Sequence, residues 1–137
     1  MKFKKILIYI TASILADIKL FIIALPSILQ SFGLHPDFDG ESFDLKGKKA
    51  LIVTTSHGVL NKPGETEGQA TGVFGSEMTI PYYEFSDANM QVDVASIKGG
   101  EIPIDPSSFI YFIKTDADKR YLKDDVFQAK VKHSIPI

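Results

Sequence analysis

The chain contains no cysteine among its 137 residues. This absence excludes disulfide bonds and thiolate metal sites, and it leaves no thiol nucleophile within these residues. Histidine is also scarce: His35, His57 and His133 lie far apart in the sequence and form no H-x-x-x-H pair. A metal site is therefore not predicted.

An excess of positive charge is also absent. The chain has 15 Lys and Arg against 17 Asp and Glu, for a net charge of -2, and its lysines form no basic stripe, which argues against a nucleic-acid partner. The glycines of residues 61–75 match neither the P-loop spacing nor the dinucleotide fingerprint, and no serine lies in a G-x-S-x-G elbow. We predict no cofactor and no serine-hydrolase chemistry.

The N-terminal residues 1–34 form a separate apolar segment. Three lysines precede residues 6–34, which hold sixteen Ile, Leu or Phe residues and are interrupted by charge only at Asp17 and Lys19. This pattern predicts a single membrane-spanning anchor with a cytoplasmic N-terminus and the domain outside the cytoplasm, although Lys46, Lys48 and Lys49 weaken that orientation. A cleaved signal peptide is the alternative, with a poor cleavage site at residues 31–33.

Residues 35–47 are polar and predict a linker, and the domain is expected at residues 48–137. We predict a buried parallel strand over 50–53 and a second strand over 91–97. A helix should connect them, starting near Thr79 or Ile80, with Pro81 in its first turn and with a core-facing stripe. That stripe comprises Met78, Tyr82, Phe85 and Ala88.

A further helix is predicted over 116–131, capped by Asp116 or Asp118. Its expected apolar face consists of Leu122, Val126 and Phe127. Strand, helix and strand in this order form one right-handed βαβ unit. Two strands with their helices cannot cover both faces of a sheet, so we expect partial exposure of Leu51, Val53 and Val94.

Three segments carry a resemblance: KKALIVTTSHG from residue 48, TGVFGSEMTIPYYEF from residue 71 and MQVDVASIKGGEIPIDPSS from residue 90. From about Leu45 to Ile137 the chain resembles the PfpI-type intracellular protease and Parkinson-associated deglycase superfamily, which is class I glutamine amidotransferase-like, in its heat-shock chaperone and glyoxalase III branch. Glu77 and Pro81 match the Glu-x-x-x-Pro context of that family. The resemblance implies part of a flavodoxin-like three-layer α/β sandwich with a parallel sheet.

The resemblance also implies a mechanism. In the family, a protonated glutamate carboxyl hydrogen-bonds a nucleophilic cysteine, which lies much further along the chain, and a histidine beside it moves protons. Glu77 corresponds to that catalytic glutamate, whereas no position here matches the cysteine or its histidine. The chain then represents the N-terminal part of the domain.

Two further residues are candidates for substrate binding. Gly72 lies in the loop that borders the active site in the family. His57 follows the first strand, where pocket residues are expected, but a lone histidine in a Ser-His-Gly turn is also typical of a solvated loop. A purely structural Glu77, favoured by the dipole of the following helix, is the corresponding alternative.

Two classes of function remain open. The complete form would be a thiol-dependent glyoxalase, deglycase or amidase acting on a small carbonyl or amide substrate, and it could form a homodimer, as family members commonly do. Alternatively, the protein is a non-catalytic membrane-tethered interaction module, a pseudoenzyme or the relic of a disrupted gene.

Overall fold

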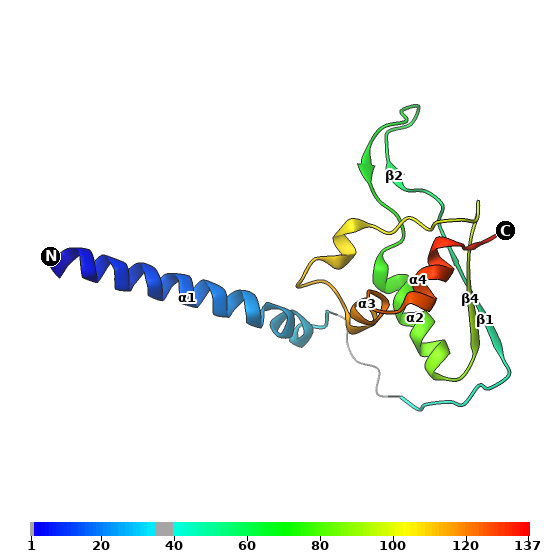
Figure 1. Cartoon of the computed structure of the whole chain (residues 1–137), viewed down its shortest axis with the longest axis horizontal. Coiled ribbons are helices and arrows are strands. Elements are labelled where there is room, and N and C mark those ends of the chain that lie inside the picture. The colour runs from blue at the N-terminus through cyan, green and yellow to red at the C-terminus, as the bar shows by residue number, and fades with distance from the viewer. Residues whose placement is uncertain (1, 35–39) are drawn as a thin grey trace. The chain divides into compact units, whose positions relative to one another are not determined.

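The computed structural model describes residues 2–34 and 40–137, which belong to two compact units, Met1–Phe38 and Asp39–Ile137. His35 and the first part of the expected linker lie outside the described residues. The first unit contains α1, Lys2–Ser31, in which Phe3–Ser31 is long and apolar enough to cross a membrane (Figure 1). A signal sequence would pass the same test of length and composition.

The second unit is a mixed α/β domain. Its elements, in chain order, are β1 (Lys49–Thr54), β2 (Val59–Leu60), β3 (Gln69–Ala70), α2 (Gly75–Asp87), β4 (Gln91–Ser96), η1 (Pro106–Phe109), α3 (Asp116–Tyr121), α4 (Asp125–Lys132) and β5 (Ile135–Pro136). The two predicted strands are thus confirmed to within one residue at each end. The hairpin of β2 and β3 occupies part of the long loop between β1 and α2.

The main sheet has the strand order β1-β4-β5 and is entirely parallel. β1 and β4 pair over their whole length, from Lys49 opposite Gln91 to Thr54 opposite Ser96. β5 pairs only with Ala95 and Ser96. α2 is the crossover between the two long strands, as the βαβ prediction required.

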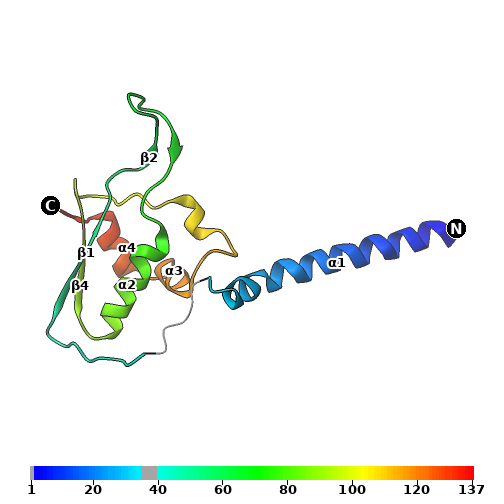
Figure 2. The same cartoon turned by 180° about the vertical axis from the view of Figure 1, so that it is seen from behind.

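The α-helices α2, α3 and α4 lie on one side of β1 and β4, as the two opposite views show (Figures 1 and 2). The core between them consists of Ile52, Met78, Tyr82, Tyr83, Val92, Val94, Ile102, Tyr121, Phe127 and Val131. On the other side of the sheet, Leu51 and Val53 are 52% and 56% exposed, which confirms that part of the prediction. The prediction for Val94 was wrong, because Val94 points into the core and is 2% exposed.

The predicted start of the first domain helix was wrong. α2 begins at Gly75, so Glu77 lies in its first turn and Pro81 lies inside the helix. Pro81 has no N–H to donate to the carbonyl of Glu77 four residues earlier. Because Glu77 is exposed, water can hydrogen-bond that carbonyl instead.

The core-facing stripe of α2 was predicted only in part. Met78 and Tyr82 are buried as expected, but Phe85 is 38% exposed. Thr79 and Tyr83 are buried in addition, because Thr79 hydrogen-bonds Asp118 of α3 and Tyr83 packs edge-on against Phe127 of α4.

The helix predicted over 116–131 is instead two helices, α3 and α4. Asp124 interrupts it, because its carboxylate accepts a hydrogen bond from the backbone N–H of Phe127 at 2.9 Å and starts a new helix. The break turns Leu122 and Val126 outward, to 46% and 68% exposure, while Phe127 is fully buried. The N-cap residue of α3 is Thr115. The prediction is confirmed in part, because Asp118 completes a capping box by accepting a hydrogen bond from the backbone N–H of Thr115, whereas Asp116 takes no part in it.

Asp118 is the centre of a buried polar network. Its side chain is 1% exposed within the domain. One carboxylate oxygen accepts a hydrogen bond from Thr79 Oγ1 at 2.7 Å, and the other accepts from the backbone N–H and Oγ1 of Thr115 at 2.9 and 2.7 Å. The carboxylate therefore joins α2 to the start of α3.

Replacing Asp118 by alanine should lower the free energy of unfolding by about 2–4 kcal/mol, because buried hydroxyl and N–H groups would lose their acceptor. Urea unfolding of the full chain in detergent, followed by tyrosine fluorescence, measures this loss. The matched control is Asp116→Ala in the same helical turn, where the side chain is 96% exposed and its ion pair with Lys119 contributes little. Equal losses for the two variants would contradict the assigned role of the network.

Candidate functional site

Polar side chains follow β1 at the carboxyl end of the sheet, where ligands bind in open parallel α/β sheets. Most of these side chains are engaged with backbone groups. Thr54 Oγ1 donates to the carbonyl of Ala95 at 3.2 Å, and Ser56 Oγ accepts from the backbone N–H of Lys98 at 2.9 Å. The first bond joins the ends of β1 and β4, and the second ties the turn after β1 to the turn after β4.

His57 lies in the turn after β1, as predicted, and its side chain is exposed. Its backbone N–H donates to Thr55 Oγ1 at 2.9 Å. The backbone N–H of Thr71 donates to the carbonyl of Gly58 at 3.0 Å, which brings the neighbourhoods of His57 and Gly72 together. Substrate binding by His57 stays a prediction.

Gly72 lies where two backbone segments approach closely. A β-carbon at this position would lie 2.1 Å from the carbonyl oxygen of Pro103. The next residue, Val73, forms a parallel bridge with Ile104, in which its N–H donates to Pro103 at 2.9 Å. Only glycine fits here, so Gly72 has a structural role, and its predicted contact with substrate stays a prediction.

The start of α2 is fixed by two buried side chains from later in the sequence. The backbone N–H of Gly75 donates to Ser108 Oγ at 2.8 Å. A β-carbon on Gly75 would lie 2.9 Å from Asp118 Oδ1 and 3.0 Å from Ser108 Cβ. Sequence reasoning missed both contacts, because neither Ser108 nor Asp118 has a local pattern that places it beside Gly75.

Glu77 lies two residues after Gly75, the residue that Ser108 holds. Its backbone N–H donates to the carbonyl of Phe74 at 2.9 Å, and its side chain is exposed. Within residues 2–34 and 40–137 the Glu77 carboxylate forms no hydrogen bond or ion pair, so it is available to a further group. The structure places it in the first turn of α2, and its catalytic role stays a prediction.

Asp105 holds the segment that packs against Gly72. Its carboxylate accepts hydrogen bonds from the hydroxyl and backbone N–H of Ser107 at 2.6 and 2.9 Å and from Thr71 Oγ1 at 3.0 Å. These donors favour the charged form and lower the pKa of Asp105. In contrast, burial and the hydrogen bond to Asp124 raise the pKa of the Tyr83 phenol, which belongs to the core.

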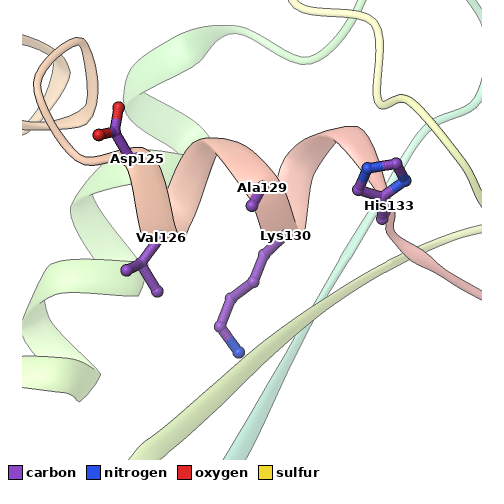
Figure 3. A pocket seen from close by; sticks show the side chains of 5 residues that line it. All are labelled: Asp125, Val126, Ala129, Lys130 and His133. Atoms are coloured by element: carbon purple, nitrogen blue, oxygen red, sulfur yellow. The ribbon is translucent and has the colours of Figure 1, made fainter.

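A shallow groove that the sequence did not predict lies along α4 (Figure 3). It is lined by Asp125, Val126, Ala129, Lys130 and His133. Their spacing of three and four residues marks one helical face, which is the signal that could have revealed it. The Lys130 side chain also forms an ion pair with Asp93 on β4, with Nζ and Oδ1 2.5 Å apart. In the described part of the chain no three acidic or histidine side chains are placed to hold a metal ion.

No family model matches the chain, and no curated protein matches it. Two solved structures are similar. The X-ray structure of Rapid Encystment Protein 24 kDa (REP24) of Francisella tularensis is 39% identical, with a TM-score of 0.55, over 65% of this chain and 37% of that chain. The crystallographic structure of APC35852 is 30% identical, with a TM-score of 0.48, over 65% and 34%. The chain thus spans little more than a third of the length of either protein.

Replacing Asp105 by asparagine should destabilise the domain at neutral pH but not in strong acid. The folded-state pKa of Asp105 is lowered, so its stabilising effect is complete above the unfolded value of about 3.9 and is lost as the pH falls through the folded value. Unfolding curves of wild type and variant across this range measure the effect. Ser107→Ala should show a smaller effect, because its backbone N–H still donates. A difference between wild type and Asp105→Asn that does not change with pH would refute the prediction.

Proposed function

We propose that residues 45–137 form the N-terminal part of a PfpI-type, class I glutamine amidotransferase-like domain that α1 tethers to a membrane. The observation that carries this proposal is the position of Glu77, in the first turn of the helix that joins two parallel strands and beside their carboxyl ends. Open parallel α/β sheets bind their ligands at that edge. The similarity to REP24, a longer protein, agrees with a larger whole domain.

The proposed complete domain is a flavodoxin-like three-layer sandwich. α2, α3 and α4 already form one helical layer on one side of the sheet (Figure 2). Leu51 and Val53 on the opposite side are apolar and about half exposed, as expected of a sheet face that a second helical layer would cover. Within the described residues, that second layer is absent.

The proposed chemistry is thiol-dependent conversion of a small carbonyl or amide substrate, as in a glyoxalase, deglycase or amidase. Glu77 would supply a protonated carboxyl that donates a hydrogen bond to the sulfur, favours the thiolate and so promotes its attack on a carbonyl carbon. The thiol would come from chain outside these 137 residues, which contain no cysteine. His57 and Gly72 would border the bound substrate.

Two features of this region support Glu77 in that role. Its carboxyl is exposed and has no partner in the described part of the chain, so no salt bridge competes for it. The backbone just before it is held by Ser108 and packs against Asp118, which fixes the direction in which the first turn of α2 points. Activation of a nucleophile requires a carboxyl group that the backbone positions and that no other side chain engages.

A non-catalytic, membrane-tethered interaction module is the second candidate. It is favoured by the open edge of β1, which no strand of residues 2–34 or 40–137 covers. An exposed strand edge is a common binding surface for another polypeptide. In this case Glu77 would be a remnant that serves the start of α2.

The enzymatic proposal predicts that Glu77→Gln lowers the removal of methylglyoxal by the protein isolated from its native source, with kcat/KM falling by about 10²–10⁴-fold. An amide N–H is a far weaker acid than a carboxyl O–H, so its hydrogen bond would stabilise the thiolate less. The matched control is Glu84→Gln on the same helix, which should retain full activity. Thiol-specific alkylation should abolish the wild-type activity.

Equal activity of the Glu77→Gln and Glu84→Gln variants would refute the role of Glu77. A native protein that contains no thiol and has no activity would favour the interaction module.

If α1 is a membrane anchor, the full chain should stay in the membrane after alkaline carbonate extraction. Protease added from outside the cytoplasm should digest the domain, because the lysines at the start of the chain favour a cytoplasmic N-terminus. Ile14→Arg should release the chain, since a charge at the centre of the helix costs about 2.5–3.5 kcal/mol. Phe43→Arg, outside the helix, is the control. A product shortened at residues 31–33 would instead identify a signal peptide.

A further inference from the structure

Three lysines lie together at the amino end of the main sheet, where β1 begins. Lys46, Lys48 and Lys49 are all exposed, and we call them the lysine patch. None of their ammonium groups forms an ion pair with residues 2–34 or 40–137. Residues 40–49 hold these three lysines against two acidic residues, so the segment has an excess of positive charge.

The segment that carries the lysine patch is fixed to the rest of the domain. The backbone N–H of Gln91 donates to the carbonyl of Lys48 at 3.0 Å. One carboxylate oxygen of Asp44 accepts hydrogen bonds from Asn89 Nδ2 and from the backbone N–H of Lys46, both at 3.1 Å. The nearest acidic side chain is therefore engaged with the turn between α2 and β4, while the lysine side chains extend into solvent.

The lysine patch lies close in sequence to the proposed membrane anchor. It follows the end of α1 at Ser31 by 15 to 18 residues, and Phe43 in between is 62% exposed. A tether this short keeps a binding group at high local concentration beside the membrane surface. Lysines are attracted to an anionic membrane surface, and an exposed aromatic side chain adds apolar burial at the interface.

We propose that the lysine patch binds the headgroups of anionic phospholipids in the leaflet that the domain faces. The inference rests on the membrane tether of the proposed function and adds an electrostatic contact to it. It does not depend on which side of the membrane the domain lies. It does not depend on further chain either, because lysine side chains are almost never buried unless paired, so a larger domain would keep them at its surface.

This contact determines which end of the sheet faces water. The lysine patch lies at the amino end of β1, whereas His57 and Glu77 lie at the carboxyl end. β1 has six residues, so its two ends are about 17–20 Å apart. With the patch on the headgroups, the carboxyl end and the β2–β3 hairpin that extends from it face away from the membrane (Figure 1). The candidate site then takes its substrate from water rather than from the bilayer.

Fluorescence quenching of the full chain in lipid nanodiscs tests the contact, because both faces of a disc are open and the chain has no cysteine of its own. Ser42→Cys, beside the patch, carries a thiol-linked fluorophore, and acrylamide is the quencher. Discs of phosphatidylcholine are compared with discs that contain about one third phosphatidylglycerol. The quenching constant should be at least about threefold lower in the anionic discs, since bound headgroups shield the label. Added salt should remove the difference by screening.

Charge variants identify the side chains responsible. Glutamine in place of all three lysines of the patch should abolish the difference between the two discs. The matched control changes the net charge equally, by glutamine in place of three other exposed lysines, and should retain the difference: Lys62, Lys98 and Lys132. A fluorophore on Glu67→Cys, in the loop between β2 and β3, should be quenched equally in both discs, as the proposed orientation requires.

Co-elution of the chain with the discs separates this proposal from the membrane tether. If the chain co-elutes with neutral discs, α1 anchors it, and equal quenching at residue 42 in both lipids would then overturn the headgroup contact alone. Co-elution with anionic discs only would support the contact and contradict the tether, whereas co-elution with neither would overturn both. A difference that survives the glutamine substitutions in the patch would also overturn the proposal.

Discussion

The buried carboxylate of Asp118 is the contact on which the helical layer of the domain depends. It accepts hydrogen bonds from Thr79 in α2 and from Thr115 at the start of α3, and it lies against Gly75 at the beginning of α2. A buried charge is stable only when such donors surround it, so the two helices must stay in this arrangement. The position of Glu77, two residues after Gly75, which Ser108 holds, follows from that arrangement.

The same constraint explains why the parallel sheet has two unlike faces. Asp118 and the aromatic core draw α2, α3 and α4 to one side, where Phe127 stacks on Tyr82 with ring centroids 3.5 Å apart. The other side keeps Leu51 and Val53 in contact with solvent. An apolar sheet face that is half exposed indicates a surface that another part of a polypeptide covers. The second helical layer of the proposed larger domain would cover it.

Local patterns in the sequence predicted the elements that depend on local chemistry. The apolar runs at β1 and β4 and the helix between them were predicted correctly, and so was the apolar helix at the N-terminus. The start of α2 was not, because Ser108 and Asp118 stabilise it from more than thirty residues away. The break between α3 and α4 was missed for a different reason: Asp124 acts as a helix cap, and its neighbours Leu122 and Val126 gave a false apolar face.

For the candidate site, the sequence predicted candidate residues but not the tertiary contacts around them. His57 and Gly72 do adjoin through the bond between Gly58 and Thr71, whereas the close approach of Gly72 to Pro103 is a tertiary contact that no motif reveals. The groove on α4 was missed because residues 116–131 were predicted as one helix with a different face, although its lining residues have helical spacing. Membership of the PfpI-type superfamily remains a proposal. The partial similarity to REP24 does not bear on it.

The central claim is that Glu77 serves a cysteine supplied by chain beyond these residues. Sequencing the native transcript past the Ile137 codon tests it most directly. The account predicts that the reading frame continues, directly or after a shift, into a glycine-rich loop and a Cys-His pair on a strand-to-helix turn. A stop codon followed by no such sequence would contradict the account and leave the protein as a membrane-tethered interaction module.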